Sequence, residues 1–197
     1  MRFRTVIMTT LLGVSTATGL SACKSTADAL NIGDAATKQN AGPCPRAFAL
    51  YEASRIVEFR DNEQRFENVG FTGEINNVRS LCRYYNDEPI DANLEITFDL
   101  GRGPAASQNA ATYEYFVAVT RKNVDVINKK VFPMQVTFPA GEDRVRVVED
   151  VEEIIIPRAT ATTSGVNFEI VVGFELTEAQ RQFNAEGRRF RLSAGQE

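Results

Sequence analysis

Residues 92–100 read Ala-Asn-Leu-Glu-Ile-Thr-Phe-Asp-Leu, and in this stretch every even-numbered position is apolar while every odd-numbered one is polar. A period of two places successive side chains on opposite faces of a β-strand. One face is therefore expected to pack on a core while the other meets water. Gly101, Gly103 and Pro104 follow directly and are expected to end the strand.

A second alternating stretch covers residues 168–176, which read Phe-Glu-Ile-Val-Val-Gly-Phe-Glu-Leu. Thr177 comes next and can cap the first turn of a helix with its side-chain oxygen. The good helix formers Glu178, Ala179 and Gln180 follow. The sequence thus predicts one more strand and then a short helix of about two turns near the C-terminus.

Further segments are rich in β-branched or aromatic residues and are separated by Gly, Pro, Asn or Asp. They are Phe48–Phe59, Val69–Ile75, Arg79–Tyr85, Tyr113–Thr120, Lys130–Phe138 and Arg144–Glu152. Strands spaced in this way, with hardly any helix, predict an all-β chain folded as an antiparallel β-sandwich. The immunoglobulin and fibronectin type III architecture is the natural comparison, and a small closed barrel is the alternative. The chain has no tryptophan, and Cys44 lies too early for the usual intersheet disulfide of an antibody domain.

The first 22 residues have the composition of an export signal. Arg2 and Arg4 precede an apolar run, and no acidic residue occurs before Cys23. Threonines and glycine interrupt the run, which is shorter than the roughly 20 residues that a permanent transmembrane helix needs. The segment ends in Leu20-Ser21-Ala22-Cys23. This ending resembles the lipobox of bacterial lipoproteins at each of its positions.

The lipobox resemblance implies that residues 1–22 are a lipoprotein signal peptide and that Cys23 carries the lipid. Each buried methylene contributes about 0.8 kcal/mol, so two or more acyl chains anchor a protein stably. Lys24 follows the cysteine, and the sorting pattern of some Gram-negative lipoproteins then favours the outer membrane. The implied location is the cell envelope, on the periplasmic face of the outer membrane.

A change in composition separates a tether from a folded domain. Between Lys24 and Gly42 the chain consists of small and polar residues, with Leu30 and Ile32 as its sizeable apolar side chains. Such a segment buries too little surface to offset its ordering entropy. We therefore expect residues 23–43 to form a flexible tether and residues 44–197 to form the β-sandwich domain.

Cys44 and Cys82 remain after the anchoring cysteine. An even number of cysteines in an exported, oxidising compartment predicts a disulfide more often than a metal site or a reactive thiol. The bridge would close a loop for which the chain-entropy model gives roughly 4 kcal/mol of stabilisation. Two buried free cysteines are the alternative.

Composition excludes several classes of chemistry. The chain has no histidine, which removes Ser-His-Asp and Cys-His catalysis and histidine-ligated metals. The formal net charge is −4, and the signal segment holds basic residues but no acidic ones, so the domain is a poor nucleic-acid binder. The two glycines of Gly101-Arg102-Gly103-Pro104 lack the ending of a phosphate-binding loop, and a strand-ending turn is expected. No cofactor is expected.

The residues Glu149, Asp150, Glu152 and Glu153 form the remaining candidate for a site. Clustered carboxylates can hold a divalent cation or act as an acid and base pair. Their spacing fits no calcium-binding loop, and an edge strand protected by charge has the same sequence pattern. The charged edge strand is the preferred interpretation, with a cation site or a histidine-independent enzyme as the alternative.

The domain also resembles a group of alphaproteobacterial envelope lipoproteins. The resemblance is carried by Cys44-Pro45, by Gly-x-Ile-x-x-Val-x-x-x-Cys from Gly73 to Cys82, and by Arg102-Gly103-Pro104 followed by Tyr-Phe-Val-Ala-Val from Tyr115 to Val119. It implies a shared sandwich and brings no activity or binding residue. The sequence therefore predicts a non-enzymatic binding or assembly module, which is held on the membrane by its N-terminal lipid. It would present strand edges or loops to another envelope protein by β-augmentation.

Overall fold

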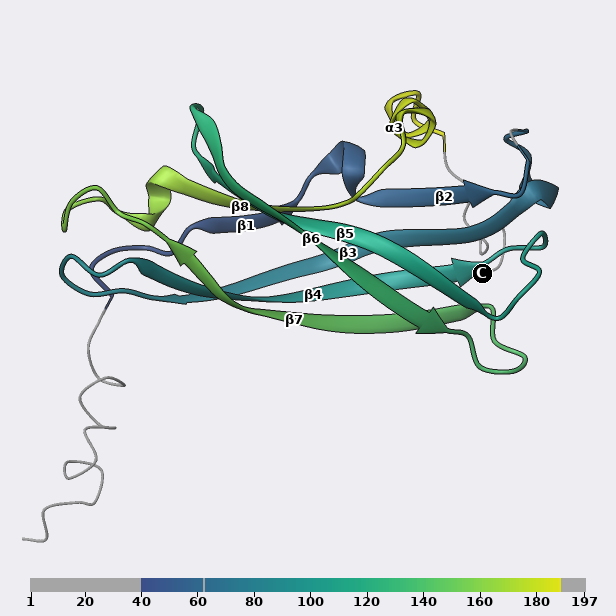
Figure 1. Cartoon of the computed structure of the whole chain (residues 1–197), viewed down its shortest axis with the longest axis horizontal. Coiled ribbons are helices and arrows are strands. Elements are labelled where there is room, and N and C mark those ends of the chain that lie inside the picture. The colour runs from purple at the N-terminus through teal and green to yellow at the C-terminus, as the bar shows by residue number, and fades with distance from the viewer. Residues whose placement is uncertain (1–39, 62, 189–197) are drawn as a thin grey trace, which may run out of the picture. The chain divides into compact units, whose positions relative to one another are not determined.

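The computed structural model describes residues 40–61 and 63–188, which form two four-stranded β-sheets packed as a sandwich (Figure 1). Sheet A has the strand order β1-β8-β5-β6, and sheet B has the order β2-β3-β4-β7. The predicted β-sandwich with a short C-terminal helix is confirmed. The strands are β1 (Arg46–Ala49), β2 (Arg55–Phe59), β3 (Val69–Arg83), β4 (Ile90–Arg102), β5 (Ala110–Arg121), β6 (Asp125–Thr137), β7 (Arg144–Ile156) and β8 (Phe168–Phe174). Short 3-10 turns are η1 (Tyr51–Ala53), η2 (Phe66–Asn68) and η3 (Gly165–Asn167), and the α-helix is α3 (Glu178–Ala185).

The alternating stretch in β4 lies as its period predicts. Its apolar side chains from Ala92 to Leu100 are buried, and the polar ones between them face outward. Phe98 lies at the centre of the core, where its ring centroid is 5.0 Å from that of Tyr115 and 5.6 Å from that of Phe174. Those two rings belong to β5 and β8 of the opposite sheet, so Phe98 joins the two layers of the sandwich.

Two strand boundaries differ from the sequence prediction. The segment 48–59 forms β1 in sheet A and β2 in sheet B, because the chain crosses between the layers through η1. The segments 69–75 and 79–85 instead belong largely to one strand, β3, whose register shifts between Ile75 and Asn77. The paired asparagines at that point thus form a bulge in a continuous strand, where the sequence prediction had two separate strands.

One strand pair is parallel, which departs from a purely antiparallel sandwich. β1 runs parallel to β8, with Arg46 opposite Glu169 and Ala49 opposite Val172. A strand that enters from the N-terminus and leaves for the other sheet has no hairpin to force an antiparallel pairing. The first strand of the sandwich therefore pairs with the last strand.

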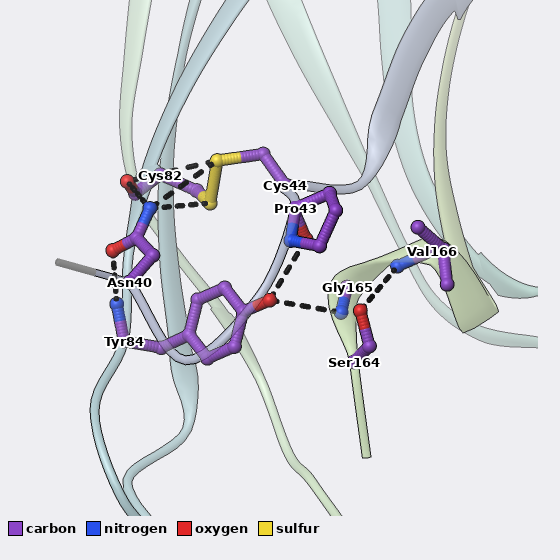
Figure 2. Close-up of a disulfide and its surroundings, with 8 residues drawn as sticks. All are labelled: Asn40, Pro43, Cys44, Cys82, Tyr84, Ser164, Gly165 and Val166. Atoms are coloured by element: carbon purple, nitrogen blue, oxygen red, sulfur yellow. Dashed lines mark hydrogen bonds between the residues drawn. A yellow bond between two sulfur atoms is a disulfide. The ribbon is translucent and has the colours of Figure 1, made fainter. Parts of the chain in front are cut away.

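The end of the sandwich near β1 is fastened by a disulfide and a buried tyrosine (Figure 2). The predicted Cys44–Cys82 bridge is present and joins the segment before β1 to the end of β3. The Tyr84 hydroxyl donates a hydrogen bond of 2.8 Å to the Pro43 carbonyl and accepts one of 3.2 Å from the Gly165 amide. These contacts hold both the chain before β1 and the turn η3 against β3.

The segment just before Cys44 is part of this fastening. The Asn40 side chain donates to the Cys82 carbonyl at 3.0 Å and accepts from the Tyr84 amide at 3.1 Å. The amide of Ala41 donates to the Tyr84 carbonyl at 3.1 Å. Residues 40–43, which the sequence placed in the tether, thus lie on the domain. The other residues of the expected tether, the expected signal peptide and Cys23 lie outside the described residues.

Arg158 links two loops at the same end of the sandwich. Its guanidinium donates to the carbonyls of Asn86 at 2.8 Å, Glu88 at 2.9 Å and Thr163 at 2.7 Å. It also lies 4.7 Å from the centroid of the Tyr84 ring. One cationic side chain therefore ties the β3–β4 loop to the β7–β8 loop.

Helix α3 begins where the sequence predicts. The Thr177 side chain accepts from the Gln180 amide, and the Gln180 side chain accepts from the Thr177 amide, which completes a capping box. Phe183 packs with Val57 and Val69 in a small second cluster beside β2. Among the described residues, no helix is long and apolar enough to cross a bilayer.

Candidate functional site

Strand edges are the candidate sites of a sandwich without obvious catalytic chemistry. An edge strand presents unpaired N–H and C=O groups that can pair with another chain, and most proteins protect such edges. In the described part of the chain, the edge strands are β1 and β6 in sheet A and β2 and β7 in sheet B. The protection of each edge therefore indicates where a partner strand can add.

The edge of β2 is covered by side chains from α3. Asn184 donates its amide nitrogen to the Arg55 carbonyl at 2.8 Å, and Gln180 donates to the Val57 carbonyl at 3.3 Å. Asn184 is itself only 5% exposed. The outward carbonyls of Arg55 and Val57 on β2 are thus already occupied by side chains of α3.

The edges of β1 and β7 are protected in other ways. β1 has four residues, and very short edge strands offer little to pair with. β7 carries exposed acidic residues, among them Asp150 and Glu152, whereas Arg146 pairs back with Asp99 of β4 at 2.6 Å. A bulge also interrupts β7 opposite Asn93, where Glu153 adopts a left-handed backbone with φ of 58°. Charge and bulge together disfavour the addition of a strand there.

The edge of β6 is exposed over its first seven residues, from Asp125 to Val131. Pro133 shows which backbone groups face outward. It lies opposite Glu114 and has no N–H, so this pair cannot be a hydrogen-bonded one. The Glu114 carbonyl indeed accepts from the amide of Glu175, which directly follows β8, at 2.8 Å. Hydrogen-bonded and non-hydrogen-bonded pairs alternate along an antiparallel ladder. The N–H and C=O groups of Lys129 and Val131 therefore also point away from β5 into solvent.

Lysines often protect an edge, but the two lysines of β6 are turned back over the sheet. The Lys129 ammonium lies 2.7 Å from the Glu175 carboxylate and 4.4 Å from the centroid of the Phe116 ring. The Lys130 ammonium lies 4.9 Å from the centroid of the Phe132 ring on the same strand. Both charges thus have partners within the protein. We call the backbone of β6 from Asp125 to Val131 the open edge.

Apolar side chains accompany the open edge. Val126 is 56% exposed, Val131 is 42% exposed, and Val124 in the turn before β6 is 70% exposed. The hairpin that joins β5 and β6 extends away from β7 at the upper left of the view (Figure 1). The β5–β6 ribbon therefore projects from the sandwich with solvent-exposed apolar residues at its end.

A groove of about 210 Å³ lies between β6 and β7, beside the open edge. Its apolar floor contains Val117 and Val119 from β5 and Phe132 from β6. Its β7 wall includes Ile154 together with the acidic residues Asp150, Glu152 and Glu153, and its β6 wall includes Asn128 and Lys130. The two sheets thus leave a hollow that an added strand on β6 would cover.

The four acidic residues singled out from the sequence divide into two roles. Glu149 faces the core, where it accepts a hydrogen bond of 3.5 Å from the Tyr115 hydroxyl. Burial of Tyr115, and then the charge of Glu149, raise the pKa of that hydroxyl, so it remains a donor. The other three line the groove. Within residues 40–61 and 63–188, no group of three or more acidic or cysteine side chains is arranged to hold a metal ion.

No family model, curated protein or solved structure matches this chain. The geometry of the open edge and the groove therefore carries the functional interpretation.

The sequence interpretation missed the open edge, although one signal for it was present. The expected strand began at Lys130 and so left out the exposed residues before it. Pro133 lies within that strand, and a proline inside a strand pattern marks an edge strand. Together with the apolar Val126 and Ile127 just upstream, it could have identified β6 as the exposed edge.

The bulge in β7 gives a prediction about stability. Glu153 holds a left-handed backbone that costs a non-glycine residue roughly 1 kcal/mol or more. Replacing Glu153 with glycine is expected to raise the free energy of unfolding by about 1 kcal/mol. The neighbouring Glu152→Gly substitution is the matched control and is expected to lower stability by about 0.5–1 kcal/mol. Urea denaturation of both variants measures the difference, and equal effects would contradict the strain.

Proposed function

We propose that this chain is a lipid-anchored lipoprotein of the cell envelope that acts as a non-enzymatic binding or assembly module. Its open edge pairs with an extended segment of another envelope protein by β-augmentation. The observation that carries the proposal is the unprotected backbone of β6 beside a partly apolar groove. Cys23 supplies the lipid, and the anchor keeps the domain where that partner lies.

The contrast between the edges supports this role. α3 side chains cover β2, shortness protects β1, and charge and a bulge protect β7. β6 also has a bulge, at Ile127, but its outward backbone groups at Lys129 and Val131 lie beyond that bulge and stay accessible, which fits an edge kept for a partner. The Cys44–Cys82 disulfide agrees with an oxidising compartment.

The alternative, a cation-binding protein or enzyme using the acidic strand, has less support. Glu149 is turned inward to Tyr115, and among the described residues the other three acidic residues form no group arranged to hold a metal ion. A charged edge strand, which needs no bound cation, accounts for the same acidic residues.

The pairing role is tested by photocrosslinking in the native host. A benzophenone amino acid at Val131, which is 42% exposed on β6, is expected to trap a reproducible partner protein. The matched control is the same amino acid at Phe66, which is 46% exposed but lies in η2, between β2 and β3 of sheet B. Trapping that is equal at both sites, or absent at both, would contradict a partner bound at the open edge.

The anchor is tested separately by metabolic labelling with a palmitate analogue. The wild-type chain is expected to take up the label and to stay with the membrane fraction after a high-salt wash. Cys23→Ser is expected to lose the label and to leave that fraction. A Cys23→Ser protein that remains labelled would exclude Cys23 as the lipidated residue.

A further inference from the structure

We infer that the segment bound at the open edge alternates apolar residues with lysine or arginine. This inference rests on the proposed pairing function and names the chemistry of the partner segment. It follows from the different surroundings on the two faces of a strand added to β6. Successive side chains of a strand point to opposite faces. Alternate side chains of the added strand therefore face the groove, and the ones between them lie on the outer face of sheet A.

One set of side chains would enter the groove. The floor there is apolar, from Val117, Val119 and Phe132, while the acidic residues Glu152 and Glu153 of the β7 bulge line the wall, against the single ammonium of Lys130. That ammonium already lies over the Phe132 ring. A lysine or arginine suits this position, because its aliphatic stem covers the floor and its charged head reaches the carboxylates.

The other set would continue the outer face of sheet A. Val131 lies on this face, opposite Phe116 of β5, and is 42% exposed. Apolar and β-branched side chains directly beside it would bury that surface, and such cross-strand pairs contribute roughly 0.2–1 kcal/mol each. The outward positions of the partner segment are therefore apolar.

The length of the segment is set by β6 itself. The open edge covers seven residues, and Pro133 then removes an outward N–H that a longer partner would need. The matching segment is accordingly short, about the length of an average strand.

A second copy of this chain is a poorer occupant than a foreign segment. Antiparallel pairing of two β6 strands about Asn128, the centre of the open edge, would set Lys129 opposite Ile127 and Lys130 opposite Val126 of the other copy. Each lysine would then lack the opposite-charge neighbour that stabilises a cross-strand pair. The Lys130 ammonium of each copy already lies over its own Phe132 ring, so the acidic residues of the groove would gain no new cationic partner. Charge complementarity thus favours a basic, extended segment from another protein.

The inference is tested with three capped, fluorescein-labelled peptides added to the full chain. The probe is Val-Lys-Val-Lys-Val-Lys-Val. One control replaces lysine by glutamate, and the other keeps the probe's composition but groups its residues as three lysines followed by four valines. Fluorescence anisotropy is expected to give an affinity for the probe at least tenfold higher than for either control.

Two variants locate the binding. Val131→Pro removes an outward N–H and no bond to β5, so the sandwich should keep its thermal stability while the probe no longer binds. Glu152→Lys combined with Glu153→Lys should weaken the probe at least tenfold and strengthen the glutamate peptide. The matched control, Asp87→Lys with Glu88→Lys in the β3–β4 turn, should leave both affinities unchanged.

The outcomes separate the two proposals. Equal binding of the lysine and glutamate peptides that Val131→Pro abolishes would overturn the inferred chemistry but keep the pairing function. Probe binding that Val131→Pro leaves intact would overturn the pairing at the open edge as well. Concentration-dependent dimers in sedimentation that Val131→Pro removes would show a second copy as the occupant and would also overturn the inference.

Discussion

Replacing both Cys44 and Cys82 with serine is expected to lower the free energy of unfolding by about 4 kcal/mol. The bridge joins residues 38 apart in sequence. Without it, the unfolded chain regains the conformational entropy that closure of this loop removes. The folded state also loses the covalent link between the segment before β1 and the end of β3. Urea denaturation of the oxidised wild type and of the double-serine variant measures the effect.

The chemical control is the wild type after reduction by dithiothreitol, which is expected to match the double-serine variant. Hydrogen exchange should locate the change. Amides of β1 should lose most protection, because β1 is short and the Tyr84 hydroxyl and Asn40 contacts then hold its N-terminal side alone. A loss of less than about 1 kcal/mol would mean that these hydrogen bonds fasten this end without the bridge.

Phe98→Ala is expected to destabilise the domain by about 4 kcal/mol. The Phe98 side chain is fully buried, and its ring packs on Tyr115 and Phe174 of the opposite sheet. Its removal takes away apolar surface and leaves a cavity between the layers, which the rigid strands around it can fill only in part. Thermal and urea unfolding of the purified variant give the change in stability.

The matched control for Phe98 is Thr97→Ala, one residue earlier on β4. Thr97 faces away from the core and is only half-buried, so this change is expected to cost less than about 1 kcal/mol. If both substitutions destabilised the domain equally, Phe98 would not be a central packing residue. The pair therefore tests the alternation that predicted the fold class.

The elements that the sequence predicted well are those with local signals. The period of two in β4 assigned each side chain from Ala92 to Leu100 to the correct face, since the pattern depends only on neighbouring residues. Thr177 and Gln180 likewise marked the start of α3 through a capping box that spans three residues. Such features need no knowledge of strand order.

The site was less predictable because it depends on strand order, which is a non-local property. The acidic residues of β7 were recognised, but the groove they line exists only because β6 and β7 end their sheets on the same side. The splitting of residues 48–59 into two strands was missed for the same reason, since both halves carry the same composition. Pro133 was the one local sign that β6 lies at an edge.

The parallel pairing of β1 with β8 affects how the domain can be made. Arg46 lies opposite Glu169, so the first strand has no place to dock until nearly the whole polypeptide has emerged. Contacts between such distant parts of a chain slow folding. A truncated chain that ends before residue 168 lacks β8, so β1 has no strand to pair with and the edge of β5 that pairs with β8 is exposed. Incomplete chains of this protein should therefore be recognisable to proteases as unfinished.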